Sequence, residues 1–509
     1  MLKSERMSNA KKQLKIGALI SYFSIFFGAI TALIYTPWME RQIGQSNYAL
    51  YNLAFSFISL FLVDFGLGTA TSRYVAKFRA EGNEDQVNAA VSLITKLYLI
   101  IDAVIFTVLL IMYGLIGTIY HGLTVDEITI FKRLYLMIAS FSIFSFPFTS
   151  LSGILLAYEE FIPLKLCDFG QKMVSVLLII WMLMHGFGVI GLVGATIGSG
   201  LLFIFIRWVI IRKKTNVRLH LTIRDPQLMK SLLGFSVWTA IMSLASRASF
   251  TLAPTILGIV SDSTQIAIFS PANVLEGYFY LLASAVNGLF LARISNYIAA
   301  NEEHRIQTLM IKIGRYQLAV MGLIFIGFAC VGQDFMRVWM GERYIQSAFA
   351  AFLIFIPDLL LFTQQIANTA IIAKNKLRPA AMISVISALV CILLSLPLSH
   401  HYGAIGACFA IATSYMISFL YMNHVYTKEL HLNIPLFFQK CYGSFLLPDL
   451  LTYTLYAFLL KRWIPFGGWK GLAVKVILIF ILYSAMLWKL GLNAEEKNYI
   501  RKFFIHKGA

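Results

Sequence analysis

Long apolar stretches separated by short polar breaks run along this chain from end to end. Each stretch is about 20 residues long, which is the length a helix needs to cross about 30 Å of hydrocarbon. In lipid the backbone must satisfy its own hydrogen bonds, so these stretches predict helices rather than isolated strands. The pattern therefore predicts an all-α polytopic membrane protein. Fourteen spans fit, at about 16–38, 48–70, 92–118, 133–156, 167–185, 189–211, 233–258, 269–291, 311–331, 346–371, 381–399, 404–424, 442–460 and 471–490.

Composition agrees with this pattern and fixes an orientation. Of the 509 residues 59% are hydrophobic and 13% are charged, which excludes an average soluble domain. The net charge is +18, and most of the 42 Lys and Arg lie in the N-terminal tail, the even-numbered loops and the C-terminal tail. This asymmetry predicts that both termini are cytoplasmic, and it favours topogenic charge beside anionic lipid over nucleic-acid binding.

The five cysteines stand singly, without the spacing of a metal site or a redox pair. We therefore expect no metal and no cofactor.

A repeat runs through the chain. Six spans per unit is an even number, so two such units enter the membrane in the same orientation, with a substrate site expected between them. The sequence thus predicts two parallel six-helix repeats followed by two further helices. The pairs that indicate the repeat are Gly68 and Arg73 with Gly288 and Arg293, Ala157 and Pro163 with Ala373 and Pro379, and Gly188 and Gly191 with Gly403 and Gly406.

The resulting division has seven parts. It comprises a cytoplasmic tail (1–15), the first repeat (16–211), a cytoplasmic linker (212–232), the second repeat (233–424), a second cytoplasmic linker (425–441), two C-terminal transmembrane helices (442–490) and a cytoplasmic tail (491–509).

Span seven carries an arginine near the middle of the bilayer. Arg247 lies about 14 residues from one end of this span, where an isolated arginine costs about 3 kcal/mol on insertion scales. Ser243 and Thr251 stand four residues on either side of it, on the same helical face. We predict that this polar face lines a cavity and that Arg247 holds an anionic group there.

Glu276 in span eight is the predicted partner of Arg247, either to tune it or to carry a coupling ion. The alternative is an ion pair that only fixes two helices. Intramembrane charges usually mark a pathway, which favours the functional interpretation.

Further ionisable residues are weaker candidates. Asp64 and Asp102, with Lys96 in span three, are expected to line the cavity from the first half, although Asp64 lies near the cytoplasmic end, where pairing with Arg73 is an alternative. Asp358 follows Pro357, which predicts a break in span ten.

Three other ionisable residues, Asp168, Lys172 and Asp449, are placed near span ends, where solvation at the interface explains them.

Three motifs and the layout of twelve plus two spans resemble a known family. The motifs are VDFGLGTATSRYVAKFRAEGN at 63–83, GVIGLVGATIGS at 188–199 and GAIGACFAIATS at 403–414. In these features the chain resembles the Wzx-type polysaccharide flippases of the multidrug/oligosaccharidyl-lipid/polysaccharide exporter superfamily.

The resemblance implies a substrate and a place in the cell. It implies transport of an oligosaccharide linked to undecaprenyl diphosphate across the bacterial inner membrane by alternating access, for O-antigen, capsule or exopolysaccharide synthesis. A proton or sodium ion would couple the cycle, and a polysaccharide polymerase is an expected partner. The diphosphate suits the guanidinium of Arg247, which can donate two parallel hydrogen bonds to phosphate oxygens, and Lys96, Ser243 and Thr251 are expected as further contacts.

Three alternatives stay open. A multidrug or cation antiporter would place acids at the centre of the site, and a peptidoglycan lipid-precursor flippase would share both the fold and the anionic lipid. A membrane-embedded polysaccharide polymerase or ligase belongs to another class, and the short outer loops and the parallel repeat favour a transporter over it.

Overall fold

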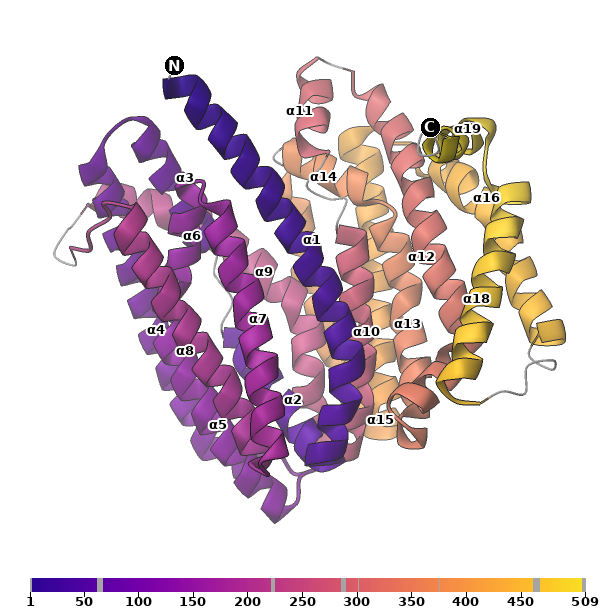
Figure 1. The fold of residues 1–509 in the computed structure, drawn as a ribbon, viewed down its shortest axis with the longest axis horizontal. Coiled ribbons are helices and arrows are strands. Elements are labelled where there is room, and N and C mark those ends of the chain that lie inside the picture. Colours follow the sequence, from indigo (N-terminus) through magenta and orange to yellow (C-terminus); the bar gives the residue numbers. More distant parts are fainter. Residues whose placement is uncertain are drawn as a thin grey trace. The chain divides into compact units, whose positions relative to one another are not determined.

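The computed structural model describes residues 2–61, 67–220, 225–284, 290–300, 302–374, 376–460 and 467–505, apart from some side chains in α1, α9 and a few other helices. All regular structure in these ranges is helical (Figure 1). Nine of the described helices are long and apolar enough to cross a membrane. Each of the fourteen predicted spans lies at least partly on a helix, although this number of crossings is not itself established. The protein is therefore an all-α membrane protein, as the hydropathy pattern predicts.

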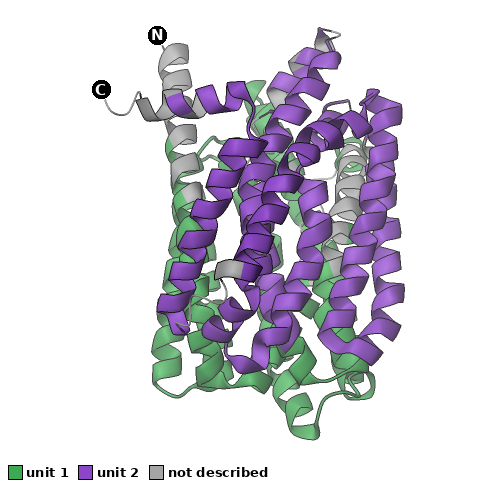
Figure 2. Ribbon diagram, turned by 90° about the vertical axis from the view of Figure 1, so that its right-hand side faces the viewer, with its two compact units in different colours: residues 1–267 green, residues 268–509 purple. Residues whose placement is uncertain are grey.

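The chain divides into two compact units, residues 1–267 and residues 268–509 (Figure 2). The first unit is built from α1 to α9. Its elements are α1 (Leu2–Ile43), α2 (Gln45–Phe61), α3 (Leu67–Ala80), α4 (Glu84–Ile119), α5 (Val125–Ser145), the 3₁₀ turn η1 (Phe146–Thr149), α6 (Ser150–Ala157), α7 (Phe161–Met184), α8 (Gly188–Lys214) and α9 (Pro226–Val260).

The second unit begins within α10, which starts a few residues before the boundary. Its elements are α10 (Ser263–Ser284), α11 (Leu291–Ala299), α12 (His304–Trp339), the 3₁₀ turn η2 (Glu342–Tyr344), α13 (Ile345–Phe362), α14 (Gln365–Ala373), α15 (Leu377–Leu430), α16 (Ile434–Leu455), the π-helical turn η3 (Tyr456–Leu460), α18 (Gly468–Met486), the π-helical turn η4 (Leu487–Gly491) and α19 (Ala494–Ile505).

Helix starts follow ordinary capping chemistry. The side chain of Asn83 accepts a hydrogen bond from the backbone N–H of Gln86 and begins α4. Thr124 and Glu127 form a reciprocal capping box at the start of α5. Asp225 caps α9 and is followed by Pro226 at the first helical position, where the missing N–H costs nothing.

The same local geometry occurs in both units. The helices α4 and α12 are each 36 residues long, and they begin at positions 84 and 304. Gly188 before the body of α8 has φ +58°, and Gly403 inside α15 has φ +56°. A left-handed residue of this kind lets the chain bend sharply between two helices, and glycine adopts it without strain. These matches are consistent with the predicted repeat, while the division of the chain into seven parts stays a prediction.

The break predicted in span ten occurs, but at Thr363 and Gln364 between α13 and α14 and not at Pro357. The helix α13 continues through Pro357 and ends at Phe362, five residues later. A proline removes one hydrogen bond, and tight packing on both sides can retain the helix despite that loss.

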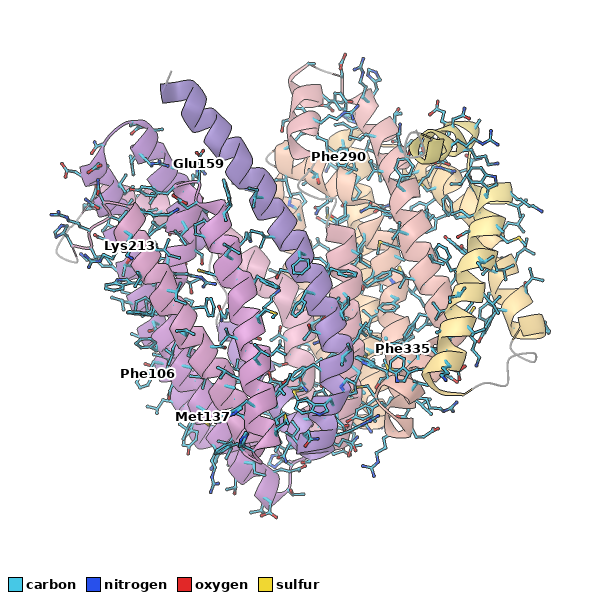
Figure 3. The ribbon with its side chains drawn as sticks, viewed as in Figure 1. Phe106, Met137, Glu159, Lys213, Phe290 and Phe335 are labelled. Atoms are coloured by element: carbon cyan, nitrogen blue, oxygen red, sulfur yellow. The ribbon has the colours of Figure 1, made fainter. Side chains whose placement is uncertain are left out.

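One outer surface of the first unit is apolar. Large hydrophobic side chains on α4 are exposed, and Figure 3 shows one of them, Phe106, projecting from the ribbon with 49% exposure. Exposed apolar surface of this extent suits contact with lipid chains. The α4 residues that form it are Leu99, Ile100, Val104, Phe106, Leu110, Ile111 and Leu115.

Candidate functional site

Two of the predicted acids lie close together inside the second unit. Glu276 on α10 is 8% exposed and Asp358 on α13 is fully buried. Their charges interact with each other. Neither carboxyl oxygen of Asp358 has a hydrogen-bond partner in the described part of the chain. A buried carboxyl group without a partner is costly, so this pair is a strong candidate for binding a proton or a cation.

Packing between α10 and α13 positions this pair. The Phe279 and Phe355 rings stack with their centroids 4.6 Å apart. The ring centroids of Tyr280 and Phe362 are 5.4 Å apart. Nearer the start of both helices, the Ser347 hydroxyl donates to the Ile268 carbonyl at 2.6 Å. The two helices are therefore held together on either side of the acids.

A tyrosine on a third helix belongs to the same cluster. Tyr415 of α15 interacts electrostatically with both Glu276 and Asp358. Sequence reasoning missed it, because a tyrosine within an apolar span resembles an ordinary core residue. It joins the acids because α15 packs against α13 in the folded chain, and the sequence carries no signal of that packing.

The candidates of the first unit lie on α4 and α9. Lys96 is half-buried and Asp102 is buried, both on α4. Six residues of an α-helix correspond to about 600°, so these two side chains lie about 120° apart around the axis and face different neighbours. One carboxyl oxygen of Asp102 has no hydrogen-bond partner among the described residues. Thr251 is half-buried on α9, which contacts α4.

Three predicted residues cannot be placed as side chains. Arg247 and Ser243 lie on α9, but their side chains are outside the described part of the structure. Asp64 lies in the segment 62–66, which is also outside it. Their roles stay predictions.

Arg315 on α12 is the most connected buried charge among the described residues. Its guanidinium forms a two-pronged ion pair with Glu496, with N–O distances of 2.6 and 2.7 Å. It also donates to the carbonyls of Lys440 and Gly491. Arg315 and Glu496 are 181 residues apart, and no periodicity in the sequence indicates that partner.

The acids that sequence analysis placed at span ends have different surroundings. Asp168 pairs with Arg207 at 2.8 Å and with Lys165 at 3.3 Å, which explains it as a structural group. Asp449 lies within α16, not at its end, so interfacial solvation does not explain it. No group of three metal-ligating side chains occurs among the residues that the structure describes.

Comparison with known proteins identifies the family. The family described as "Polysaccharide biosynthesis protein" matches residues 14–286, more than half of the chain. The chain belongs to this family. The match covers the first unit from residue 14 onward and the start of the second, and it agrees with the resemblance found in the sequence motifs.

A relative of this polysaccharide biosynthesis protein is a probable low-salt glycan biosynthesis flippase, Agl15, of Haloferax volcanii. The two are 19% identical over 195 residues, which cover 38% of this chain and 41% of the relative. The match thus spans less than half of either protein.

Solved structures share the fold along most of the chain. The lipid II flippase MurJ in an inward closed conformation matches with a TM-score of 0.70 and 14% identity, covering 93% of this chain and 99% of the other. An inward-facing multidrug resistance MATE family transporter matches with a TM-score of 0.65 and 15% identity, and the match covers 79% of this chain and 94% of the transporter. A transporter of the MOP superfamily from Pyrococcus furiosus matches with a TM-score of 0.60 and 14% identity, and the match covers 83% of this chain and 95% of that transporter. This member of the polysaccharide biosynthesis family therefore has the MOP transporter fold.

Proposed function

We propose that the protein is a flippase that moves a lipid-diphosphate-linked oligosaccharide from the cytoplasmic to the outer leaflet of the bacterial inner membrane. The observation that carries this proposal is the match of residues 14–286 to the polysaccharide biosynthesis family. The partial likeness to a glycan biosynthesis flippase and a fold shared with a lipid flippase support it. The transported oligosaccharide would then be used by a polysaccharide polymerase.

In this proposal Arg247 holds the diphosphate. A guanidinium offers parallel N–H donors that match phosphate oxygens, and its charge persists inside the membrane. Lys96, Ser243 and Thr251 supply further contacts. The lipid tail stays in the bilayer while the head group crosses, so the transporter has only a polar group to shield.

The acids couple transport to an ion gradient. Two neighbouring buried carboxylates repel each other when both are ionised, and a bound proton or sodium ion removes that repulsion. Glu276 and Asp358 are such a pair. Binding or release of the ion would change how tightly α10 packs against α13, which is the kind of two-state element that drives a conformational cycle. Asp64 and Asp102 are the corresponding candidates in the first unit.

The test uses purified full-length protein in sealed liposomes that contain a labelled undecaprenyl-diphosphate oligosaccharide. An impermeant sugar-modifying enzyme reports the substrate that reaches the opposite leaflet. We expect flipping that depends on the protein and falls at least about tenfold in Arg247→Ala, because a charge-assisted contact of this kind is lost. The control is Arg305→Ala, which removes an arginine whose side chain is 54% exposed and paired only at the surface.

Unchanged flipping by Arg247→Ala at normal expression would remove Arg247 from the site. No flipping of this substrate by the unsubstituted protein would contradict the proposed function itself.

A cation antiporter is the second candidate, and the Glu276 and Asp358 pair favours it. Buried acids are the groups that bind organic cations, and a MATE transporter shares the fold. The same vesicles decide between the two. Efflux of an organic cation without lipid flipping would assign the protein to the antiporters, while flipping of lipid II in place of the oligosaccharide would assign it to peptidoglycan synthesis.

A further inference from the structure

An apolar pocket with one unpaired acid lies in the second unit, between α12, α13, α16 and η3. Its volume is about 560 Å³, which is in the range of ordinary ligand pockets. The lining combines phenylalanine and leucine side chains with a smaller set of polar groups. The apolar lining includes Phe325, Phe328, Phe349, Phe352, Leu446 and Leu450, and the polar lining includes Gln333, Asp334, Asp449, Tyr453 and Tyr456.

The charge of Asp449 is not balanced by the protein. One of its carboxyl oxygens is buried without a hydrogen-bond partner in the described part of the chain, and no ion pair reaches it there. The other acid of the pocket, Asp334, is already paired with Lys475 at 2.6 Å and with Arg337 at 3.5 Å. The pocket therefore holds one acid that no basic side chain pairs among the described residues, in apolar surroundings where an ionised carboxylate needs a partner.

Two tyrosines that interact with Asp449 do not supply that partner. Tyr442 and Tyr483 both interact electrostatically with Asp449. The hydroxyl of Tyr442 donates to the Leu359 carbonyl at 3.0 Å, and that of Tyr483 donates to the Ala319 carbonyl at 3.3 Å. Because a tyrosine hydroxyl has one proton, neither remains free to donate to Asp449.

The apolar side of the pocket is accessible. Phe349, Leu446 and Leu450 line it and are 51%, 60% and 53% exposed. Contact of so much apolar surface with water is unfavourable, whereas contact with a hydrocarbon chain is favourable. An occupant that matches both sides has an apolar chain and a cationic head that donates hydrogen bonds.

We propose that this pocket binds a phospholipid whose head group carries a primary ammonium. The ammonium pairs with Asp449, and an acyl chain lies along the phenylalanines. Gln333 and Tyr453 offer uncharged donors for the phosphate oxygens. This site is separate from the residues proposed for the transported lipid, and it does not depend on the proposed function.

The experiment measures lipid retention by the full-length protein purified in detergent. The protein is incubated with an equal mixture of phosphatidylethanolamine, phosphatidylcholine and phosphatidylglycerol, and bound lipids are counted by native mass spectrometry. We expect selective retention of phosphatidylethanolamine. Phosphatidylcholine keeps the positive charge but cannot donate a hydrogen bond, and phosphatidylglycerol lacks the amine.

Two variants test the two halves of the pocket. Asp449→Asn should lower phosphatidylethanolamine retention by about tenfold, the loss of one charge-assisted hydrogen bond, and leave phosphatidylglycerol unchanged. Leu450→Trp should lower retention by filling the apolar side while the acid stays in place, so the test survives if the aspartate variant fails to fold. The control is Asp126→Asn, an exposed acid in the first turn of α5.

Equal retention of the three lipids, preference for phosphatidylglycerol, or unchanged retention in both pocket variants would each overturn the proposal.

Discussion

At the scale of single residues, the buried acids differ in what their surroundings allow. Asp358 is fully buried, with neither carboxyl oxygen partnered among the described residues. Glu496 is also buried, with 6% side-chain exposure, but it is held by the guanidinium of Arg315. The Asp358 carboxyl group can therefore gain or lose an ion during a transport cycle, whereas the Glu496 carboxylate forms a fixed structural contact.

Replacement of Asp358 by asparagine should uncouple transport. The amide cannot carry the charge that an ion neutralises, so we expect flipping to continue without responding to an imposed proton or sodium gradient. The measurement is flipping in liposomes with and without each gradient, and Asp126→Asn is the control. A variant that still followed the gradient would show that coupling lies elsewhere.

The contact between Arg315 and Glu496 should weaken in acid. Burial raises the pKa of Glu496, but hydrogen bonds from Arg315 and from the backbone of Asn493 outweigh it and hold this pKa below its ordinary value of 4.5. A carboxyl with a lowered pKa stabilises the folded state above its unfolded pKa, and this contribution is lost as the pH falls through the folded value. We therefore expect the attachment of α19 to begin to weaken as the pH falls below about 4.5, and to weaken further through the lower pKa of the folded state.

A nitroxide at Asn498→Cys, an exposed position on α19, would report this as faster spin-label motion. Glu496→Gln should show the motion already at neutral pH, because removing one partner of a buried pair costs about 3 kcal/mol or more. The control is Glu302→Gln, which removes one member of an exposed pair. A label whose motion stayed the same from pH 7 down through the acid range in which the protein remains folded would contradict the prediction.

At the scale of elements, glycine turns shape both units. Gly188 and Gly403 take left-handed backbone conformations, and each is followed three residues later by a glycine in close contact. A Cβ at Gly406 would overlap the Leu398 carbonyl, and one at Gly191 would overlap the Phe187 side chain. The second glycine of each pair lets the preceding helix end approach closely.

Gly406→Ala should therefore destabilise the second unit. The added methyl meets backbone, which cannot rotate away, so the cost is at the upper end of the usual 1–3 kcal/mol for overpacking. Thermal unfolding in detergent would measure it as a lower midpoint. The matched control is Gly194→Ala, since a Cβ there meets nothing within 4 Å. Equal midpoints for the two variants would show that the helix end relaxes.

The hydropathy pattern located these helices well and some of their details poorly. Apolar length predicts where a helix lies because lipid leaves the backbone no other choice. It does not predict that α13 continues through Pro357, because that depends on the packing of its neighbours.

Site residues divide in the same way. An acid in an apolar span, such as Glu276, can be recognised in the sequence, because an ionisable side chain inside the membrane is energetically costly and therefore points to a function. Its neighbours are not visible, since Tyr415 comes from another helix more than a hundred residues away. Periodicity gives the face of a helix but not what lies opposite.

At the scale of the whole molecule, the distribution of basic residues predicts how the chain is oriented in the membrane. Asp126, at the start of α5, follows an odd-numbered loop and should be outside, whereas Lys213, near the end of α8, should be on the cytoplasmic side (Figure 3). Both positions are exposed.

Single cysteines at these two positions should therefore label from opposite sides. In a variant without the five native cysteines, an impermeant maleimide should label Asp126→Cys in intact cells and Lys213→Cys only after permeabilisation. Labelling of Lys213→Cys in intact cells would reverse the orientation and place the proposed substrate entry on the wrong side.

The bend at Gly403 also affects how the chain is made. Residues 377–430 form helix almost without interruption, and only this glycine departs from helical geometry. During synthesis the two arms are joined only by the short polar segment at residues 400–403, so little hydrophilic chain must pass through the insertion machinery. They can enter the bilayer together as a hairpin, with each arm shielding the other, and a mutation that lengthened the connection would slow biogenesis before it altered transport.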